Sequence, residues 1–394
     1  MNDKIKIVLK SGKDQSVRRL HPWVFSGAIK KIYGDPAEGA LVHVYDNKDE
    51  LLATGHYQIG SIAVRILAFK DIDTDEDFWF DRFKSAYNLR LQAGLAESSE
   101  TNVYRLINAE GDNLPGLIID YYNGNIVIQV HSIGIYRNLD SITTALKKLY
   151  GSKLLSIYDK SETTIPFKAE IEGKNRSLFG EANGAIILEN NLKFKVDWTE
   201  GQKTGFFIDQ RENRLLLEKY SKDRKVLNMF CYTGAFSVYA IRGGAELVNS
   251  VDSSAKAIDL VNENITMNFP EANHTSYAVD AFNFLEEIKD KYDLIILDPP
   301  AFAKHQNVLH NAIQGYKRLN QKALEQIKNG GILFTFSCSQ VVSRENFRKS
   351  VFAAAANTGR KVQILHQLSQ PADHPVSIYH PEGEYLKGLV LYVE

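Results

Sequence analysis

The chain has 394 residues, of which 44% are hydrophobic and 24% are charged, and its formal net charge is -1. This length predicts two or three domains, and the composition is that of a soluble globular protein. The sequence has no apolar run of the roughly 18 residues that span a membrane, and no secretion signal. Its two cysteines exclude a disulfide framework and a multi-cysteine zinc site. We therefore expect a cytoplasmic protein without membrane association and without a metal.

Residues 1–71 have the pattern of a small β-barrel. Short alternating runs are separated by turn-forming residues, and they cover 4–9, 40–46, 50–57 and 61–69. The first 31 residues also hold eight basic residues against two acidic ones. A solvated face explains this excess by itself, and the alternative is a local phosphate-binding patch. The candidate members of that patch are Arg18, Arg19, Lys30 and Lys31.

Residues 72–185 combine the helical and the strand periodicity. Apolar residues at helical spacing predict helices over 78–95 and 135–151. The predicted strands are 103–109, 116–122, 125–131 and 153–159. We interpret this region as a small α+β domain in which no residue pattern indicates chemistry.

From residue 186 to residue 394, continuous apolar strands alternate with helical patterns. Such alternation predicts a parallel, Rossmann-like sheet with helices on both faces, whose ligands bind beyond the carboxyl ends of the strands. The strands are expected at 225–230, 246–252, 276–280, 293–298 and 330–337. The predicted fold class is multidomain α/β.

The first three strand ends predict a site for an adenosine with a small charged appendage. The turn with Gly234 leads into a helix, whose free N–H groups suit a carboxylate. Asp252 follows 18 residues later, where an acid can bind both hydroxyls of a ribose. One glycine with bulky neighbours disfavours the pyrophosphate of a dinucleotide and favours S-adenosylmethionine. The predicted cofactor contacts are Phe230, Tyr232, Gly234, Ala235, Asp252, Ser253, Asp280 and Ala281.

The fourth strand ends in the segment Asp298-Pro299-Pro300-Ala301-Phe302. Two prolines end a strand and stiffen the backbone, so that Asp298 and the prolyl carbonyls can bind the edge of a planar base. Phe302 is available for stacking on that base, which contributes ~1–3 kcal/mol. The alternative is that the prolines only end the strand, but this alternative does not explain why Asp298 precedes them.

The fifth strand ends at Cys338, 40 residues after Asp298. Carbon C5 of a pyrimidine is a poor nucleophile, but a thiolate added to C6 activates it toward a sulfonium methyl group. Taken alone, Cys338 is better explained as a small core residue. Its position one strand-helix unit after Asp298 makes it the predicted nucleophile, with Asp298 beside N3 of a cytosine. Cys231 lies in the cofactor turn, where packing or cofactor contact explains it better than catalysis.

Six segments complete the pattern. They are HPWVFSGAI (21–29), GQKTGFFIDQRENR (201–214), FCYTGAFSVYA (230–240), DPPAFAK (298–304), FTFSCSQVVSRENF (334–347) and QPADHPV (370–376). Together they resemble the bacterial 23S ribosomal RNA large-subunit methyltransferase I family, which makes 5-methylcytosine, and the resemblance covers essentially the whole chain. It implies an RNA-binding PUA domain at 1–71, a middle domain at 72–185 and a methyltransferase domain at 186–394. It also implies S-adenosylmethionine as cofactor and 23S rRNA as partner, and it is compatible with a homodimer.

The resemblance further implies roles for particular residues. Segment 201–211 would help to close the cofactor pocket, Cys338 would be the nucleophile, and Asp298 would support the base. The implied pocket contacts are Lys203, Thr204, Phe207, Asp209 and Arg211. Many other RNA 5-methylcytosine enzymes carry a second cysteine in the Asp-Pro segment, and here there is none. The acceptor of the C5 proton is therefore unassigned.

Three alternatives remain at this stage. A methyltransferase of another position, such as guanine N7, needs no cysteine beside the base. A non-catalytic RNA-binding protein of ribosome assembly needs neither the cofactor turn nor Cys338. A dinucleotide oxidoreductase is the least supported alternative, because the chain lacks the glycine fingerprint in its cofactor turn.

Overall fold

The computed structural model describes residues 5–166, 173–303 and 305–394, and the chain forms two compact units. Unit 1 comprises Met1–Ile187, Val196–Ile208 and Ala372–Gly383, and unit 2 comprises Leu188–Lys195, Asp209–Pro371 and Glu384–Glu394. The division differs from the three predicted domains, because both N-terminal regions share unit 1 and two segments beyond residue 186 join them. Residue 4, where the first predicted strand begins, lies outside the described residues.

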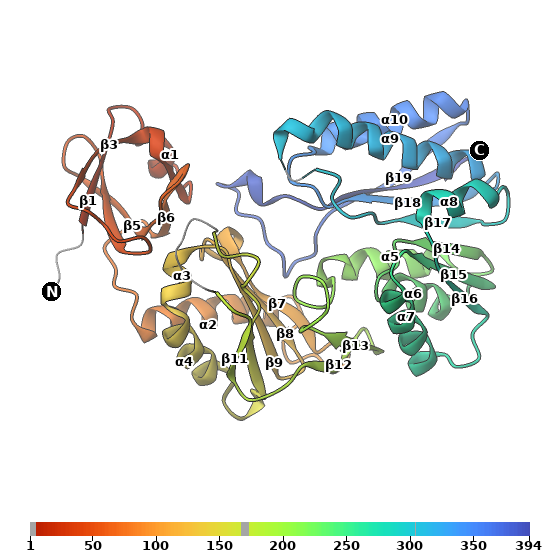
Figure 1. The fold of residues 1–394 in the computed structure, drawn as a ribbon, viewed down its shortest axis with the longest axis horizontal. Coiled ribbons are helices and arrows are strands. Elements are labelled where there is room, and N and C mark those ends of the chain that lie inside the picture. Colours follow the sequence, from red (N-terminus) through yellow and green to blue (C-terminus); the bar gives the residue numbers. More distant parts are fainter. Residues whose placement is uncertain (1–4, 167–172, 304) are drawn as a thin grey trace. The chain divides into compact units, whose positions relative to one another are not determined.

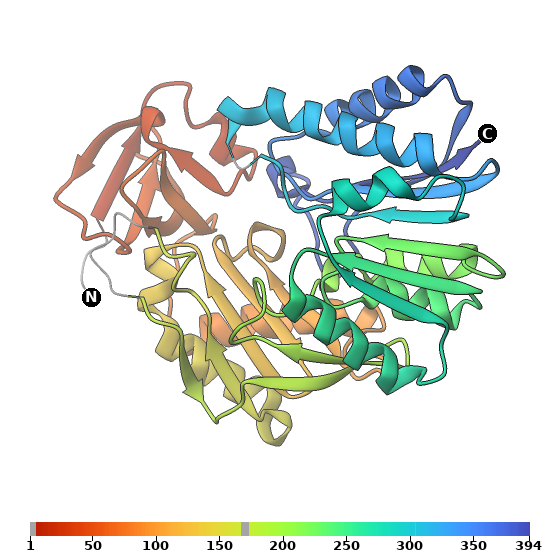
Figure 2. The same cartoon turned by 45° about the vertical axis from the view of Figure 1, so that its right-hand side comes forward.

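The first part of unit 1 is a curved six-stranded sheet in the order β2-β6-β5-β4-β1-β3 (Figure 1; Figure 2). Strands β1 and β4 are parallel, and the other neighbours are antiparallel. Alternating side chains such as those of Ile7, Val42 and Val64 form its core. The elements are β1 Ile5–Leu9, α1 Gln15–Arg18, β2 Trp23–Phe25, β3 Ile29–Tyr33, β4 Leu41–Tyr45, β5 Leu51–Tyr57 and β6 Ile62–Ala68. The runs predicted as strands are confirmed.

The second part of unit 1 is a five-stranded sheet in the order β11-β10-β9-β8-β7, with helices packed on it. Asp75 caps α2 by accepting a hydrogen bond from Phe78 N, and Trp79 and Phe83 of that helix are fully buried. The elements are α2 Glu76–Gln92, β7 Val103–Asn108, β8 Leu117–Tyr122, β9 Asn125–Val130, α3 Ile133–Arg137, α4 Leu139–Tyr150, β10 Ser156–Asp159 and β11 Arg176–Phe179. The helix predicted over 78–95 and the strands predicted over 103–109, 116–122 and 125–131 are confirmed. The helix predicted over 135–151 is instead two helices that meet at Asn138, and the strand predicted over 153–159 covers only Ser156–Asp159.

Hydrogen bonds explain why Ala372–Gly383 belongs to unit 1. The buried Arg90 forms a bidentate ion pair with Asp112, and its Nη2 donates to the carbonyl of Asp373 at 2.9 Å. The backbone N–H of Arg105 donates to the Asp373 carboxylate at 3.0 Å. The carbonyl of Pro375 accepts from Asn108 Nδ2 at 3.0 Å. The Asp-His-Pro part of the QPADHPV motif therefore anchors this segment.

The same segment also packs on β2 through His380. The His380 ring is buried, and its centroid lies 4.3 Å from that of Trp23. The Glu382 carboxylate lies 3.8 Å from Nε2 of both His380 and His21. Aromatic packing on Trp23 holds the end of the segment, and burial lowers the pKa of His380, which favours its neutral form.

Unit 2 is built on a seven-stranded sheet in the order β16-β15-β14-β17-β18-β20-β19. Strands β14 to β18 are parallel, as predicted, but β20 is antiparallel to both β18 and β19. The prediction of a wholly parallel sheet is wrong at this edge, because β19 and β20 were not predicted. The strands are β14 Lys225–Met229, β15 Leu247–Asp252, β16 His274–Ala278, β17 Leu294–Leu297, β18 Gly331–Ser337, β19 Val362–Leu368 and β20 Lys387–Val393.

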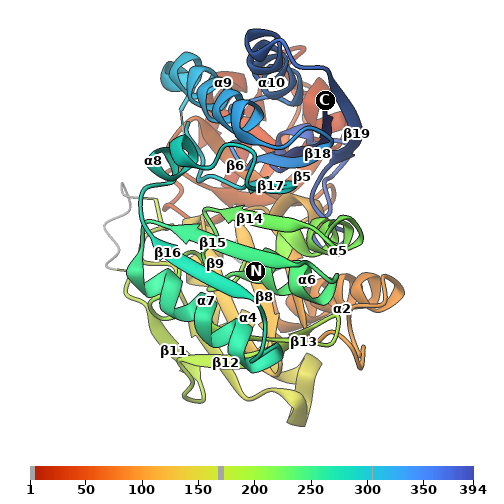
Figure 3. The same cartoon turned by 90° about the vertical axis from the view of Figure 1, so that its right-hand side faces the viewer.

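Helices cover both faces of this sheet (Figure 3). One face carries α5 Arg211–Tyr220, α6 Ala235–Arg242 and α7 Ala255–Asn268. The other carries α8 Ala281–Phe284, α9 Leu309–Gln326 and α10 Arg344–Thr358. Two further strands, β12 Gly184–Glu189 and β13 Leu192–Asp197, form a hairpin. Among the described residues, no helix is both long enough and apolar enough to pass through a bilayer.

Candidate active site

The turn between β14 and α6 is tightly constrained. Phe230, Tyr232 and Gly234 have φ values of 58°, 46° and 73°, in the left-handed region. A Cβ at Gly234 would lie 2.9 Å from Cγ1 of Val261 in α7, so that only glycine fits without a shift. The backbone N–H of Gly234 donates to the carbonyl of Cys231 at 2.8 Å. The turn is thus a rigid support directly before Ala235, the first residue of α6.

Asp252 lies beside this turn at the end of the neighbouring strand. Its Oδ2 accepts from Tyr232 N at 3.1 Å, and its Oδ1 accepts from Ser254 N at 3.0 Å. The side chain is half-buried, and the adjacent Ser253 is exposed. A carboxylate has lone pairs left after two such bonds. Asp252, the residue predicted to bind the ribose, is therefore oriented by the same turn that is predicted to bind the methionine carboxylate of the cofactor.

The third predicted strand end differs from the structure by two residues. Strand β16 ends at Ala278, and Asp280 is the N-cap of α8, where its Oδ1 accepts from Asn283 N at 3.0 Å. Asp280 is exposed, and Ala281 is buried. Capping accounts for Asp280 locally, and the contact of Asp280 and Ala281 with an adenine stays a prediction.

Asp298 and Cys338 follow neighbouring parallel strands, and the structure brings their segments together. Leu297 of β17 pairs with Thr335 of β18, and Cys338 Sγ lies 3.9 Å from the carbonyl oxygen of Pro299. Cys338 is only partly buried. Ser339 Oγ donates to the carbonyl of Ala303 at 2.7 Å, which also ties the cysteine turn to the Asp-Pro-Pro segment.

Gln210 is a site residue that the sequence analysis missed. Its Nε2 donates to Asp298 Oδ2 at 3.0 Å, and its Oε1 accepts from Asn213 Nδ2 at 2.6 Å. Gln210 and Asn213 are both buried. This chain of amides orients the Asp298 carboxylate. The signal was present in the GQKTGFFIDQRENR segment, but no spacing rule relates Gln210 to a residue 88 positions later.

The other residues predicted to contact the base have different environments. Pro299 is buried and Pro300 is exposed. The Phe302 ring is half-buried and packs on Tyr316 of α9, with 4.6 Å between ring centroids. Burial raises the pKa of Tyr316 to about 12, so this phenol stays protonated at neutral pH. One side of Phe302 is therefore occupied by protein, and its stacking on a base stays a prediction.

The predicted contacts in segment 203–211 are divided between the units. In unit 1, Thr204 Oγ1 donates to Asp120 Oδ2 at 2.7 Å, and Lys203 Nζ lies 5.5 Å from the centre of the Phe207 ring. In unit 2, Asp209 Oδ2 accepts from the Tyr385 hydroxyl at 2.6 Å.

Arg211 of the same segment is 1% exposed, and its Nε lies 3.6 Å from a carboxylate oxygen of Glu189. Arg214 forms hydrogen bonds of 2.8 and 2.7 Å with the two oxygens of that carboxylate. This environment favours a structural role for Arg211.

A cavity of about 460 Å³ lies at the amino ends of the parallel strands of unit 2, away from their carboxyl ends. Lys225 and Leu247, the first residues of β14 and β15, line it together with Tyr292. The predicted cofactor and base ligands follow the carboxyl ends of the strands and do not line this cavity. We therefore assign it no part in the chemistry.

Arg18 differs in its environment from the rest of the predicted basic patch. The guanidinium of Arg18 forms ion pairs with Asp14, Asp46 and Glu50 at 2.7, 2.8 and 2.6 Å. Three carboxylates more than neutralise its charge, so Arg18 is a weaker candidate for a phosphate ligand than the other basic residues of the patch.

The other members of that patch are exposed, and they have an aromatic neighbour that the sequence analysis missed. Arg19, Lys30 and Lys31 are all exposed. Lys31 Nζ lies 4.4 Å from the centre of the Tyr33 ring, which is itself 50% exposed. A cation beside an exposed ring suits a single-stranded nucleic acid better than charge alone.

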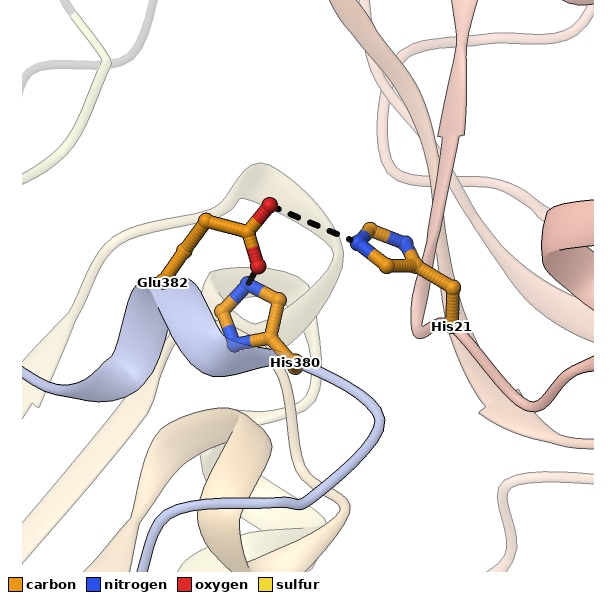
Figure 4. Close-up of side chains that lie close together, drawn as sticks. All are labelled: His21, His380 and Glu382. Atoms are coloured by element: carbon orange, nitrogen blue, oxygen red, sulfur yellow. Dashed lines mark ion pairs between the residues drawn. The ribbon is translucent and has the colours of Figure 1, made fainter.

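His21, His380 and Glu382 are the described residues whose side chains could hold a metal ion, because their ligand atoms lie within 4.8 Å of one another (Figure 4). They belong to unit 1, whereas Asp298 and Cys338 belong to unit 2.

Comparison with known proteins decides the family. A model of the S-adenosylmethionine-dependent methyltransferase family matches residues 109–378, and a PUA-like domain model matches residues 7–69. Proteins named "Ribosomal RNA large subunit methyltransferase I" from Tolumonas auensis and Aeromonas hydrophila are each 40% identical to this chain, with 98% of both chains covered. The chain belongs to this methyltransferase family. Its cofactor is S-adenosylmethionine.

Solved structures agree with this assignment. A chain described as a SAM-dependent methyltransferase from Streptococcus mutans superposes with a TM-score of 0.83 at 25% identity, over 98% of this chain and 99% of that one. A second structure, described as a methyltransferase complexed with SAH, gives a TM-score of 0.84 at 26% identity over the same shares. The fold is therefore a PUA-like domain combined with a methyltransferase domain, as predicted.

Proposed function

We propose that this methyltransferase transfers a methyl group to C5 of a cytosine in 23S ribosomal RNA, through a covalent adduct between Cys338 and C6. The observation that carries the proposal is the placement of the partly buried thiol 3.9 Å from the carbonyl oxygen of Pro299, directly after Asp298. Transfer to a nitrogen needs no nucleophile at this position. A carbon that must first be activated does need one.

The chain's own residues account for most of the reaction. The Cys338 thiolate adds to C6 of the cytosine while the carboxylic acid of Asp298 gives its proton to N3, where negative charge develops, and that proton returns to Asp298 when the thiolate leaves. Bound S-adenosylmethionine supplies the electrophilic methyl group that C5 then takes up. Loss of the C5 proton to a base, followed by expulsion of the Cys338 thiolate, restores the aromatic ring and frees the enzyme. Gln210 holds the carboxyl group of Asp298 in place throughout.

RNA as the substrate is supported from unit 1. The PUA-like domain carries Lys30, Lys31 and the exposed Tyr33 on or beside β3. The relatives' names refer to the RNA of the large ribosomal subunit. An enzyme that modifies this RNA acts where ribosomes are assembled, which agrees with a cytoplasmic location.

The decisive experiment is a modification assay. The full-length protein is incubated with labelled S-adenosylmethionine and large-subunit RNA from cells that lack the modification, and the product is digested and analysed by mass spectrometry. We expect labelled 5-methylcytosine at one position. A labelled guanine, or no transfer, would exclude the proposal in favour of a nitrogen methyltransferase or a non-catalytic RNA-binding protein.

The covalent step is tested separately. Cys338→Ala should lower transfer by at least about 1000-fold while the dissociation constant of the cofactor changes less than about twofold. RNA that contains 5-fluorocytosine should trap a protein–RNA adduct on Cys338, because fluorine cannot leave C5 as a proton does. An active Cys338→Ala protein would show that the reaction does not proceed through this thiol.

A further inference from the structure

Lys387, the first residue of β20, is a buried cation beside the predicted nucleophile. It is 3% exposed, and it pairs with Ser337 across the β18–β20 ladder. Its Nζ donates to the carbonyls of Ser339 and Val342 at 2.5 and 2.6 Å. These two carbonyls lie on either side of the turn that follows Cys338. A buried lysine of this kind is rare, because its charge must be offset by hydrogen bonds or by a negative partner.

The surrounding charges leave Cys338 as the natural partner of this lysine. The groups that act on Lys387 are Cys338, Arg344 and Glu384. Arg344 and Glu384 form an ion pair with each other. In the part of the chain that the structure describes, Lys387 forms no ion pair with a carboxylate.

Tyr316 of α9 interacts electrostatically with Cys338, but it is a neutral phenol at neutral pH because burial raises its pKa to about 12. Two groups raise the pKa of Lys387, Cys338 and Glu384, and the effect of Cys338 is the larger of the two.

We propose that Lys387 is a positioning residue that fixes the Cys338 turn through two carbonyls and favours the thiolate form of Cys338 through its charge. This inference rests on the proposed function for its catalytic meaning. The electrostatic effect itself is independent of RNA and of the cofactor.

The electrostatic interaction between Lys387 and Cys338 affects the pKa of both groups. Burial lowers the pKa of Lys387 to about 8, and the proximity of Cys338 opposes that decrease. An interaction that stabilises the protonated amine beside a thiolate stabilises the thiolate beside the protonated amine to the same extent. Because an ordinary thiol has a pKa of about 8.5, a nearby cation increases the fraction of thiolate at neutral pH.

The test measures the pKa of the Cys338 thiol without any methyl transfer. Alkylation of the full-length protein by iodoacetamide is followed from pH 6 to pH 10, and peptide mapping separates Cys338 from Cys231. Lys387→Gln keeps donors for the two carbonyls but removes the charge, and Lys387→Arg keeps the charge. The control is Lys361→Gln, because Lys361 is an exposed lysine directly before β19.

We expect Lys387→Gln to raise the thiol pKa by about one unit, which lowers the alkylation rate at pH 7 about tenfold. Its methyl transfer should fall and recover as the pH is raised. Lys387→Arg should retain most of the wild-type alkylation profile, and Lys361→Gln should be unchanged.

An unchanged thiol pKa in folded Lys387→Gln, verified by circular dichroism and cofactor binding, would overturn the inference and leave Lys387 a structural role. If Lys387→Gln does not fold, Lys387→Arg decides: a thiol pKa raised as far as that of an isolated cysteine would overturn the inference. Wild-type protein that alkylates as expected but forms no 5-methylcytosine would contradict the proposed function alone.

Discussion

Gly234 shows how one residue controls the cofactor turn. Its positive φ and its contact with Val261 both exclude a Cβ. We expect Gly234→Ala to weaken S-adenosylmethionine binding at least about tenfold, since strain and displacement of α7 cost on the order of 1–3 kcal/mol. Isothermal titration calorimetry measures the dissociation constant. The matched control is Gly244→Ala, where φ is +84° but the nearest atom to a Cβ would lie 3.7 Å away. Equal effects of the two variants would show that general backbone strain, and not the turn, is responsible.

Gln210 should affect the reaction more than cofactor binding. Gln210→Leu removes the donor to Asp298, and a hydrogen bond to a charged group contributes about 1.5–3 kcal/mol. We expect kcat to fall about 10- to 100-fold, with cofactor affinity unchanged within a factor of about two. Single-turnover rates with large-subunit RNA provide the measurement. A loss confined to cofactor affinity would mean that Gln210 supports the pocket and not the base.

At the scale of residues, local patterns predicted the groups at strand ends, and geometry then brought Asp298 and Cys338 together. Gln210 and Lys387 could not be predicted, because the side chain of each donates a hydrogen bond to a residue that is distant in the sequence. The ion pairs of Arg18 could not be predicted for the same reason, since its acidic partners include Asp46 and Glu50, which lie in another turn of the chain.

Among the elements, the contact of β5 with α3 makes unit 1 sensitive to acid. His56 of β5 is buried against Gly134, where a Cβ would lie 2.2 Å from the imidazole. Burial lowers the pKa of His56 to about 4, so the native state stays neutral while the unfolded state binds a proton below about pH 6.5. The free energy of unfolding should therefore fall as pH decreases from 6.5 toward 4, by about 2 kcal/mol at pH 5.

Tryptophan fluorescence can follow this transition. All three tryptophans, Trp23, Trp79 and Trp198, belong to unit 1. Urea unfolding at pH 7.5 and pH 5.0 should show the loss in wild-type protein and a smaller one in His56→Asn. Some loss should remain, because burial lowers the pKa of His131 to about 4 as well. An identical loss in both proteins would contradict the assignment to His56.

The surface of β3 should bind RNA through Lys31 and Tyr33. Tyr33→Ala removes the exposed ring, and loss of one base stack costs ~1–3 kcal/mol. We expect Tyr33→Ala and Lys31→Ala each to weaken RNA binding about 5- to 100-fold, with a smaller salt dependence for Lys31→Ala alone. Fluorescence anisotropy at several salt concentrations measures this. Lys48→Ala, an exposed lysine in the turn before β5, is the control. Equal effects of all three variants would indicate diffuse electrostatic attraction.

The parallel core of unit 2 was predictable as elements because β14, β15, β17 and β18 are short runs rich in buried apolar residues and are separated by helical patterns. The antiparallel pair was not. Strand β19 has exposed apolar side chains such as Ile364 and Leu365 and no alternating pattern, since it is an edge strand. Because β20 was not predicted, the position of its first residue, Lys387, next to the Cys338 turn was not predicted either.

For the whole molecule, the chain passes between the units more than once, which no periodicity in the sequence indicates. Segment Val196–Ile208 is held in unit 1 by Trp198, whose ring stacks on Tyr122, and by Thr204. Lys203, Thr204 and Phe207 are predicted to contact the cofactor, while the turn with Gly234 belongs to unit 2. The cofactor contacts in each of these segments stay predictions that can be measured separately.

Hydrogen exchange measured by mass spectrometry tests each set of predicted cofactor contacts in the intact protein. At saturating S-adenosylmethionine, about 100 times its dissociation constant, a bound state is stabilised by ~2.7 kcal/mol, which slows exchange up to about 100-fold where binding suppresses opening. We expect slower exchange in peptides that cover 230–235 and in peptides that cover 201–207. The β-sheet around Ile7 and Val42 should not change and serves as the internal control. Protection limited to 230–235 would remove Lys203, Thr204 and Phe207 from the cofactor site and leave binding to unit 2 alone.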